Sequence, residues 1–556
     1  MDHHVQQSIL LHDGDFHCIF QSVISNTIVV FTILTVILQI ETLFHVCCRL
    51  CSTIPVHPKL SDVLPSTACE LDYPFVAIQL PMMNEIGCCG SAIDCACSLD
   101  WPKSRLLIQV LDDSTDEQTK TVINKCVHRW ADRGMRIKIY RRENRKGFKG
   151  GNLANGMLHI GQAAYVAIFD VDFLPTKDYL MKTLPILIQD PTVAYVQARW
   201  TFTNRKETLL TRMQEIAMNF HHKCEQDGRF RASLFWSFNG TGGVWRTSII
   251  EQIGGWGTDT LVEDFDLSIR AYAKGWRSVY MHDVECLSEL PSTVSAYLSQ
   301  QHRWTSGTIQ LARKQAKAIY QSRHISWHKK LYCLWCLFRP CTHFINVLSL
   351  VVIMPITIFI PQPYSYNLIH TCCKISTCLC YGMFTIDEFY LILFYIVFSS
   401  ATSLNNACAT ISGLFNFNSA KEWTVTPKFG CESNNICLGT TLIEKHSSTL
   451  KRDENVSNAL SEKNIKQSYS WRALFNIYLC KNHFRWTYQQ IRIKLRSFRL
   501  YKRNFCMGAY LLVISYLAFE KRAYDTGIYI FSISIMHFSL AFGCMGRQNQ
   551  QSKHII

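Results

Sequence analysis

The chain has 556 residues, of which 48% are hydrophobic and 18% charged, so a disordered chain is excluded and several domains can be accommodated. Its 25 cysteines are too sparse for a small disulfide-stabilised scaffold. The formal net charge is +15, and residues 413–504 alone contain 16 Lys and Arg against 6 Asp and Glu. Because apolar segments flank that stretch, we interpret the charge as a membrane-topology signal, and no nucleic-acid partner is expected.

Five apolar segments are candidates for membrane spans. The first, at 23–40, lies in a stretch without Asp, Glu, Lys or Arg, and about 20 apolar residues cross a bilayer. A cleaved signal peptide is the alternative, but residues 1–22 contain no Lys or Arg and three Asp, unlike a basic n-region. The other four segments lie in the C-terminal part of the chain: 344–360, 389–415, 505–519 and 523–544. A buried core helix is the alternative for 505–519.

The positions of Lys and Arg near the ends of these segments predict the orientation. The N-terminal tail has neither residue, whereas basic residues follow the first span, precede the second and fill the stretch after the third. The predicted division is a non-cytosolic tail (1–22), an anchor (23–44), a cytosolic body (45–338), spans with a short luminal loop (339–415), a basic cytosolic loop (416–504), two C-terminal spans (505–545) and a cytosolic tail (546–556).

Two cysteine clusters lie beside predicted spans. The first follows the anchor, where S-acylation and free thiols are both open: Cys47, Cys48 and Cys51. The second falls in the predicted luminal loop, where disulfides can form: Cys372, Cys373, Cys378 and Cys380.

The cytosolic body alternates between strand-like and helix-like segments. Such alternation predicts an α/β fold with a mostly parallel sheet and helices on both faces. Ligands bind such sheets at the carboxyl ends of the strands. The expected strands are 75–80, 106–111, 137–140, 165–169 and 193–199, and the expected helices are 86–97, 117–130, 152–160 and 177–189.

Acidic residues end two of these strands. Asp170 and Asp172 can hold a divalent cation that bridges phosphate oxygens, and Mg²⁺ or Mn²⁺ prefers such oxygen ligands. A solvated acidic strand end is the alternative. Asp112 and Asp113 end the second strand, where they form part of a nucleotide–metal site, cap the following helix, or do both.

Three further groups complete the set of candidates. Glu263 and Asp264 begin a helix-like stretch, where they stabilise the helix dipole or serve as a general base. Lys149 lies in a glycine-containing loop that can approach a phosphate. A motif with Gln300, Arg303 and Trp304 lies on an expected helix, either as a surface pair or as a site for a diphosphate and a sugar ring.

The order of these motifs resembles that of processive family 2 glycosyltransferases of the cellulose synthase superfamily, whose pattern is D, DxD, ED and QxxRW. The flanking runs IQVLDDSTD, FNGTGGVWR, VEDFDLSIRA and QQHRWTSG are similar to the plant cellulose-synthase-like A and C groups. The chain departs from their usual pattern at Gly150 and Gly242, where those groups carry Ala, without losing a catalytic carboxylate. The resemblance implies a GT-A-type, Rossmann-like domain and a helical transmembrane bundle of about five spans.

The resemblance also implies a role for each candidate residue. Asp264 would be the catalytic base, with Asp113 and Asp172 as further catalytic carboxylates. Asp112, Asp113, Lys149 and Asp170 would bind the nucleotide sugar, and Asp170 and Asp172 would hold Mg²⁺ or Mn²⁺. Four residues would bind the pyrophosphate and the acceptor: Glu263, Gln300, Arg303 and Trp304.

The implied activity is inverting synthesis of a β-1,4-linked polysaccharide in the Golgi membrane by a multi-pass enzyme surrounded by lipid. IQVLDDSTD and SELPST favour the A group, which makes mannan or glucomannan from GDP-mannose and GDP-glucose. LDWPK and DVEC favour the C group, which makes the glucan backbone of xyloglucan from UDP-glucose. A catalytically inactive membrane scaffold is a third alternative, and association between copies of the chain stays open.

Overall fold

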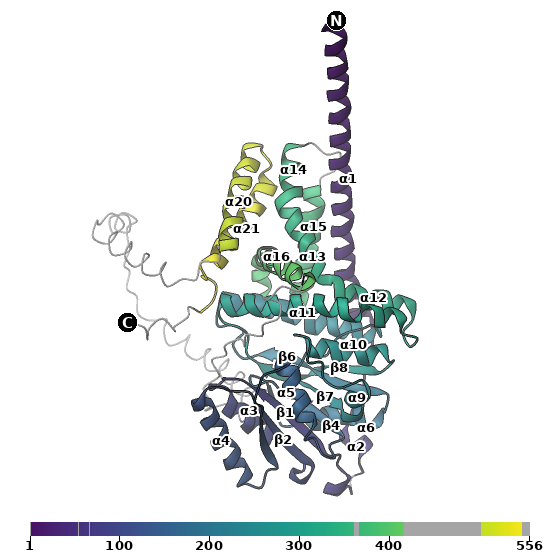
Figure 1. The fold of residues 1–556 in the computed structure, drawn as a ribbon, viewed down its shortest axis with the longest axis vertical. Coiled ribbons are helices and arrows are strands. Elements are labelled where there is room, and N and C mark those ends of the chain that lie inside the picture. The colour runs from purple at the N-terminus through teal and green to yellow at the C-terminus, as the bar shows by residue number, and fades with distance from the viewer. Residues whose placement is uncertain (1, 54, 66, 361–365, 416–501, 548–556) are drawn as a thin grey trace, which may run out of the picture.

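The computed structural model describes residues 2–53, 55–65, 67–360, 366–415 and 502–547. Almost the whole predicted basic loop, 416–504, and most of the C-terminal tail lie outside these residues. Figure 1 shows an α/β body at one end and a group of long helices at the other, with helix α11 (Val294–Gln321) between them.

An eight-stranded sheet forms the centre of the body, in the order β3-β2-β1-β4-β7-β6-β8-β5. Four of the seven neighbouring pairs are parallel, and β7 runs antiparallel to both of its neighbours. The five expected strands are confirmed, and the sequence pattern missed β5, β7 and β8. The strands are β1 (Val76–Met82), β2 (Leu106–Asp112), β3 (Ile137–Arg141), β4 (Tyr165–Ile168), β5 (Leu174–Pro175), β6 (Val193–Phe202), β7 (Gly243–Arg246) and β8 (Arg277–Ser288).

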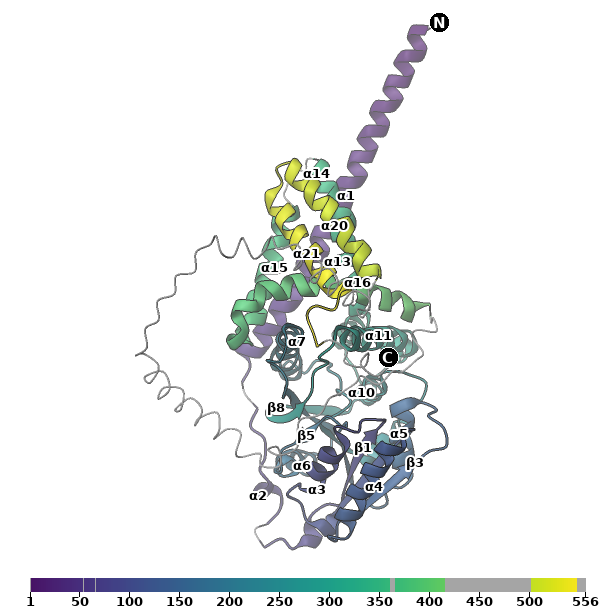
Figure 2. The same ribbon diagram turned by 90° about the vertical axis from the view of Figure 1, so that its left-hand side faces the viewer.

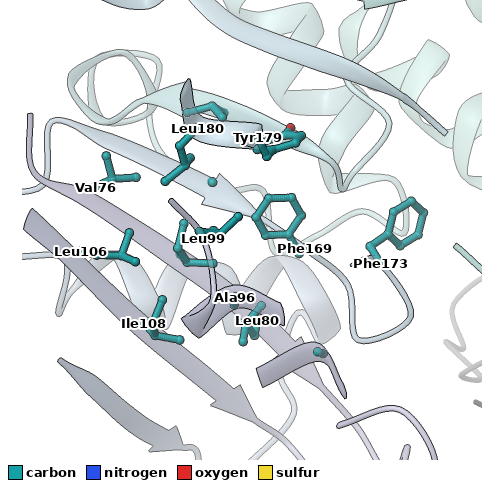
Figure 3. Packing of buried hydrophobic residues seen from close by; sticks show 14 of the residues in the cluster. Val76, Leu80, Ala96, Leu99, Leu106, Ile108, Phe169, Phe173, Tyr179 and Leu180 are labelled. Atoms are coloured by element: carbon teal, nitrogen blue, oxygen red, sulfur yellow. The ribbon is translucent and has the colours of Figure 1, made fainter. Parts of the chain in front are cut away.

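Helices cover both faces of the sheet, as expected for an α/β fold. Alternate residues of a strand point to opposite faces, and on β1 Val76 and Ile78 belong to one core whereas Ala77 belongs to the other. Figure 3 shows part of the first core, where Leu80 and Ile108 pack near Ala96 of α3. The helices of the first face are α3 (Cys89–Cys97), α4 (Glu117–Ala131) and α6 (Tyr179–Gln189); those of the second are α5 (Phe148–Met157), α9 (Thr247–Gln252) and α10 (Glu263–Ala273).

The four expected helices of the body are all confirmed, although one begins earlier than the sequence indicates. The segment expected at 152–160 is α5, which begins at Phe148, so Lys149 lies in a helix rather than in the preceding loop. A further helical run links the sheet to the long helices: α7 (Leu209–Phe220), the π-helix η3 (His221–Gln226) and α8 (Asp227–Arg231).

Among the described residues, three helical segments are long and apolar enough to cross a membrane: Ile19–Cys51, Trp327–Phe359 and Ile386–Leu414. They cover the first three predicted spans, of which the second and third were expected to extend one residue further. The last two predicted spans form an adjacent helical pair, α20 (Lys502–Glu520) and α21 (Tyr524–Ala541). The remaining helices are α1 (Asp2–Cys51), α2 (Leu60–Val63), α12 (Trp327–Phe338), α13 (Thr342–Leu348), α14 (Met354–Phe359), α15 (Tyr366–Met383) and α16 (Ile392–Leu414).

Two features of this region differ from the sequence-based picture. The segment 361–388, expected as a luminal loop, contains the 18-residue helix α15, and its four cysteines are free thiols. Polar residues lower the hydropathy of this helix, so a search for apolar segments does not find it. Two of these residues bond to Gln39 of α1: Gln39 Nε2 donates to Ser376 Oγ at 2.8 Å, and Thr377 Oγ1 donates to Gln39 Oε1 at 2.6 Å. Figures 1 and 2 show α16 lying across the direction of α1, and it packs against α11 and α21.

Candidate active site

A cavity of about 520 Å³ lies at the carboxyl ends of β1, β2 and β4, beneath α11. Segments far apart in the sequence contribute to its wall because parallel strands bring their carboxyl ends to one edge of the sheet. Nine of the ten candidate residues line it: Asp113, Lys149, Asp170, Asp172, Glu263, Asp264, Gln300, Arg303 and Trp304. The tenth, Asp112, is not part of the cavity wall.

Asp112 and Asp113 have different surroundings although they are neighbours. Asp112 is buried, and its Oδ2 accepts a hydrogen bond from Arg141 Nε at 2.7 Å. Asp113 faces the cavity, and its Oδ1 accepts from Arg142 Nε at 3.0 Å. Neither caps the next helix, because the cap is Asp116, whose side chain accepts from the Thr119 N–H at 2.8 Å. The capping alternative is therefore wrong, and Asp113 is the member of the pair that a ligand can reach.

Lys149 connects three segments of the site. Its Nζ lies 2.6 Å from Asp170 Oδ1 and 3.8 Å from Glu263 Oε1, and it donates to the carbonyl oxygen of Gly240 at 3.0 Å. Burial alone would lower the pKa of Lys149, but the two carboxylates outweigh burial and raise it above its ordinary value. The ammonium is therefore a fixed positive charge at the centre of the acidic cluster.

Asp170 and Asp172 follow β4 and are held by neighbouring hydroxyl groups. The Asp170 N–H donates to Thr241 Oγ1 at 2.8 Å, and Ser288 Oγ donates to Asp172 Oδ2 at 3.1 Å. Burial raises the pKa of Asp170, and Lys149 opposes that shift only in part. No group of three or more His, Cys, Asp or Glu side chains suited to a metal occurs in the described part of the chain. Two carboxylates nevertheless fit Mg²⁺ or Mn²⁺, because such ions complete their coordination with water and substrate phosphates.

Glu263 and Asp264 form the first turn of α10 and also line the cavity, so the helix-terminus and site interpretations hold together. Burial raises the pKa of Glu263 to about 7, with Lys149 opposing and Asp264 adding to the shift. Burial also raises the pKa of Asp264, against the opposing charges of Lys149 and Arg303. A carboxylate with a raised pKa in a cavity is suited to accept a proton near neutral pH.

The motif on α11 brings its three candidate side chains to one wall of the cavity. Gln300, Arg303 and Trp304 are separated by three and four positions, which places them on one helix face. Burial lowers the pKa of Arg303, whereas the nearby charges of Glu263, Asp264 and Asp170 oppose that shift. The guanidinium therefore lies in the field of the same carboxylates that surround Lys149.

Glycines allow the chain to pass close to these carboxylates. Gly240 has φ +84°, and a Cβ there would lie 2.9 Å from Asp264 Oδ2. The structure also explains Gly150 and Gly242, the two positions at which the related groups usually carry Ala. A Cβ on Gly150 would collide with the Gly257 carbonyl oxygen and press on Glu263, and Gly242 has φ +65°. In this chain the close approach of α5 to α10 therefore requires glycine at 150.

The sequence did not identify several residues that shape the cavity. Trp200 lines it and packs against Phe173 and His222, with ring centroids 4.9 and 5.2 Å apart. Thr241 and Ser288 position the two aspartates after β4. The runs VQARWTF, FNGTGGVWR and SELPST contain Trp200, Thr241 and Ser288, and they marked motifs without indicating a role for these residues.

The α/β sheet, the aspartate pair after β4, the buried carboxylates of α10 and the Arg–Trp motif of α11 together define a glycosyltransferase. Residues 165–403 match the model of "Glycosyl transferase family group 2". "Glucomannan 4-beta-mannosyltransferase 1" of Oryza sativa subsp. japonica is 41% identical over 379 residues, which cover 66% of this chain and 72% of that protein. "Glucomannan 4-beta-mannosyltransferase 7" of Arabidopsis thaliana is 40% identical over 365 residues, which cover 64% and 65%. The chain belongs to this family, the cellulose-synthase-like A group of the family 2 glycosyltransferases.

A solved structure is also similar in fold. It is the mannosyltransferase of Pyrobaculum calidifontis in complex with GDP-Man and Mn²⁺, with 17% sequence identity and a TM-score of 0.45. The similarity covers 70% of this chain and 100% of that one.

Proposed function

We propose that this chain polymerises a β-1,4-linked mannan or glucomannan from GDP-mannose, with GDP-glucose as a second donor, and inverts the anomeric carbon. The observation that carries the proposal is the single cavity that holds the base candidate Asp264, the Asp170–Asp172 pair and Arg303. The names of the relatives, together with identities near 40%, support mannose over glucose as the principal sugar.

In the proposed reaction, a carboxylate oxygen of Asp264 accepts the proton of the acceptor's 4-hydroxyl group. The raised pKa of Asp264 suits that role, because a base works best when its pKa lies near the operating pH. Arg303 and Lys149 neutralise the negative charge that develops on the departing diphosphate. Trp304 offers an apolar plane for the acceptor sugar, Gln300 and Glu263 bind the acceptor and pyrophosphate, and Asp113 contacts the nucleotide. Asp112, at the end of β2, holds Arg141 at the end of β3 and so supports the nucleotide subsite from behind.

Asp170 and Asp172 are the residues that would hold Mg²⁺ or Mn²⁺. When bound, such an ion supplies positive charge to the diphosphate leaving group. Lys149 pairs with Asp170 at 2.6 Å, so Asp170 would serve both this ammonium and the ion. Removal of divalent ions by a chelator is expected to stop transfer, and added Mg²⁺ or Mn²⁺ to restore it.

The membrane helices complete the proposal. The cavity includes Tyr297, Trp304 and Thr308 of α11, and α11 packs on its other side against α16. We infer a multi-pass Golgi enzyme whose cytosolic site delivers its product past α11 toward the membrane helices. This arrangement would couple synthesis to export of the polymer.

A donor comparison tests the function. The full-length protein, purified in detergent with Mg²⁺ or Mn²⁺, should incorporate label from GDP-mannose in preference to UDP-glucose, into a product that β-mannanase degrades. The matched control is Asp264→Asn, which should incorporate neither label. Incorporation from UDP-glucose alone, with a product sensitive only to cellulase, would replace this proposal by the glucan synthase alternative.

A further inference from the structure

A second cavity, of about 380 Å³, lies where α1 meets α15 and the η3 helix. Its wall contains four cationic side chains, Arg49, Arg199, Arg205 and Lys223, and the carboxylates of Glu215 and Asp387. The turn after α15, residues 383–387, closes one side. We call this cavity the basal pocket, because its wall includes Arg49 near the end of α1, and Figure 2 shows that end of α1 next to the catalytic body. Its lining therefore has an excess of positive charge.

Lys223 differs from the three arginines of the wall because it forms no ion pair among the described residues. Three arginines of the wall have carboxylate partners: Arg49 pairs with Asp227 at 2.6 Å, Arg205 pairs with Glu215 at 3.1 Å, and Arg199 pairs with Glu285. Within the described part of the chain, by contrast, none of the ion pairs includes Lys223, and its Nζ donates to the Phe384 carbonyl oxygen at 3.4 Å. Burial, together with the charges of Arg199 and Arg205, lowers the pKa of Lys223 although Glu215 and Glu285 oppose that shift, so an anion bound beside the ammonium would stabilise its charged form.

The rim of the basal pocket carries exposed apolar side chains beside the exposed carboxylate of Asp387. Met383 and Ile386 belong to the wall, yet they are 50% and 78% exposed. Arg49 lies at the end of Ile19–Cys51, one of the segments able to cross a membrane. A cationic cavity with exposed apolar side chains at the end of a membrane helix matches an amphiphile with an anionic headgroup.

We propose that the basal pocket binds the phosphate headgroup of an anionic membrane lipid. Lys223, Arg205 and Arg49 surround the phosphate, and the acyl chains leave over Met383 and Ile386. The inference rests on the proposed membrane placement of α1 and not on the identity of the sugar donor. A binding measurement can therefore fail while the transferase assignment stands, and the reverse also holds.

The basal pocket shares its wall with the catalytic cavity. On the run formed by α7 and η3, Glu215, Asn219 and Lys223 follow one another at four-residue spacing and line the basal pocket. Gln214, Met218 and His222 follow at the same spacing, one position earlier, and line the catalytic cavity. On β6 the neighbours Arg199 and Trp200 divide in the same way. A bound lipid would therefore contact the other side of the elements that form the catalytic wall.

The test measures binding of short-chain lipids to the full-length protein in neutral detergent. A fluorescent dioctanoyl phosphatidic acid is the probe, and unlabelled phosphatidic acid, phosphatidylcholine and inorganic phosphate compete. Wild-type protein should bind the probe, with displacement by phosphatidic acid at far lower concentrations than by the other two. Equal competition by phosphatidylcholine would overturn anion recognition, and equal competition by inorganic phosphate would overturn the lipid assignment.

Charge variants locate the binding to the basal pocket. Lys223→Met keeps most of the aliphatic stem and should weaken probe binding about tenfold or more, because one charge-assisted contact is lost. Lys223→Arg keeps the charge and should bind within about threefold of wild type, as should Lys103→Met at an exposed position outside the pocket. Unchanged affinity in Lys223→Met would refute the site. If that variant does not show a cooperative thermal transition, Arg205→Gln at a more exposed side chain provides the same comparison.

Discussion

The charges of Lys149, Arg303 and Glu263 act on Asp264 in its cavity, so the effect of a substitution there depends on charge as well as on chemistry. Asp264→Asn keeps the size of the side chain but removes the proton acceptor. We expect kcat to fall by about 100- to 10,000-fold, the range typical of general base catalysis, while donor affinity changes less than about threefold. Single-turnover transfer and donor binding by calorimetry check the two values separately.

The matched control is Asp259→Asn, at an exposed carboxylate that pairs with Lys314 before α10. It removes a nearby negative charge but no candidate base, and its kcat should stay within about twofold of wild type. If Asp264→Asn retains a tenth or more of wild-type turnover, Asp264 is not the base.

The pH dependence of the reaction follows from the burial of the Asp264 carboxyl group. Burial raises the pKa of Asp264 above that of an ordinary aspartate, which is about 3.9. The base acts when deprotonated, so activity should appear only as the pH rises through this raised value. The logarithm of kcat/KM should therefore begin to fall at a higher pH than an ordinary aspartate would give as the solution is acidified, because kcat/KM reports the free enzyme.

Lys149→Met provides the second half of the pH test. Lys149 lowers the pKa of both Glu263 and Asp264, so its removal should move the acidic limb to still higher pH. Lys138→Met, at an exposed position of β3, is the control and should leave the limb in place. An acidic limb of kcat/KM at the pKa of an ordinary aspartate, about 3.9, in wild-type protein would contradict a raised pKa for the base.

At the scale of elements, the segment after α21 holds the loop that closes the catalytic cavity. The Leu210 N–H donates to the Met545 carbonyl oxygen at 3.0 Å, and the Arg547 N–H donates to that of Ser292 at 2.7 Å. Arg547 also pairs with Glu207. The loop 288–291 lines the cavity, so the C-terminal segment positions part of the active site.

Gly546 offers a specific test of this connection. A Cβ there would lie 2.5 Å from the Ser292 carbonyl oxygen, so Gly546→Ala must displace the segment or the loop. We expect a loss of about 1–3 kcal/mol in stability, the usual range for steric overpacking, and a several-fold fall in kcat/KM. Thermal unfolding and steady-state kinetics measure both. Cys544→Ala, at an exposed neighbour, should change neither, and normal kinetics in Gly546→Ala would show that the segment does not position the loop.

For the whole molecule, the predicted topology places the catalytic body in the cytosol. Two N-x-S/T sequons lie in segments with this orientation, at Asn239 and Asn455. Asn239 bonds to Gln226 beside the cavity and is poorly suited as a reporter. Asn455 lies outside the described residues, and its sequence-based assignment to the cytosol is directly testable.

Because glycans are added only on the luminal side, Asn455 should be unmodified, and glycosidase treatment should leave the gel mobility of the expressed protein unchanged. The positive control is Gln6→Asn, which creates Asn-Gln-Ser in the predicted non-cytosolic tail and should add one glycan. A mobility shift in wild-type protein that is lost in Asn455→Gln would reverse the orientation and place the active site in the lumen.

The sequence by itself determined the class of the catalytic body. Five strands and four helices could be read from local periodicity, because each segment buries a face that its own residue pattern specifies. The order of the acidic motifs and the Gln–Arg–Trp motif identified the family, since those residues are fixed by the chemistry of the reaction. Nine of the ten candidates then met in one cavity.

Only the tertiary structure decided how these parts are arranged. The four-residue strand β7 and the two-residue strand β5 are too short to carry a periodic signal, and their pairing partners lie far away in the sequence. Helix α15 was missed because several of its polar side chains bond to neighbouring helices, as Ser376 and Thr377 do to Gln39 of α1 and Asn367 does to Thr526 of α21. The turning of Asp112 toward Arg141, the contact of Lys149 with Asp170 and the gathering of cations in the basal pocket are likewise long-range pairings. Local sequence reports which face a residue prefers, whereas the partner that it meets depends on packing between distant segments.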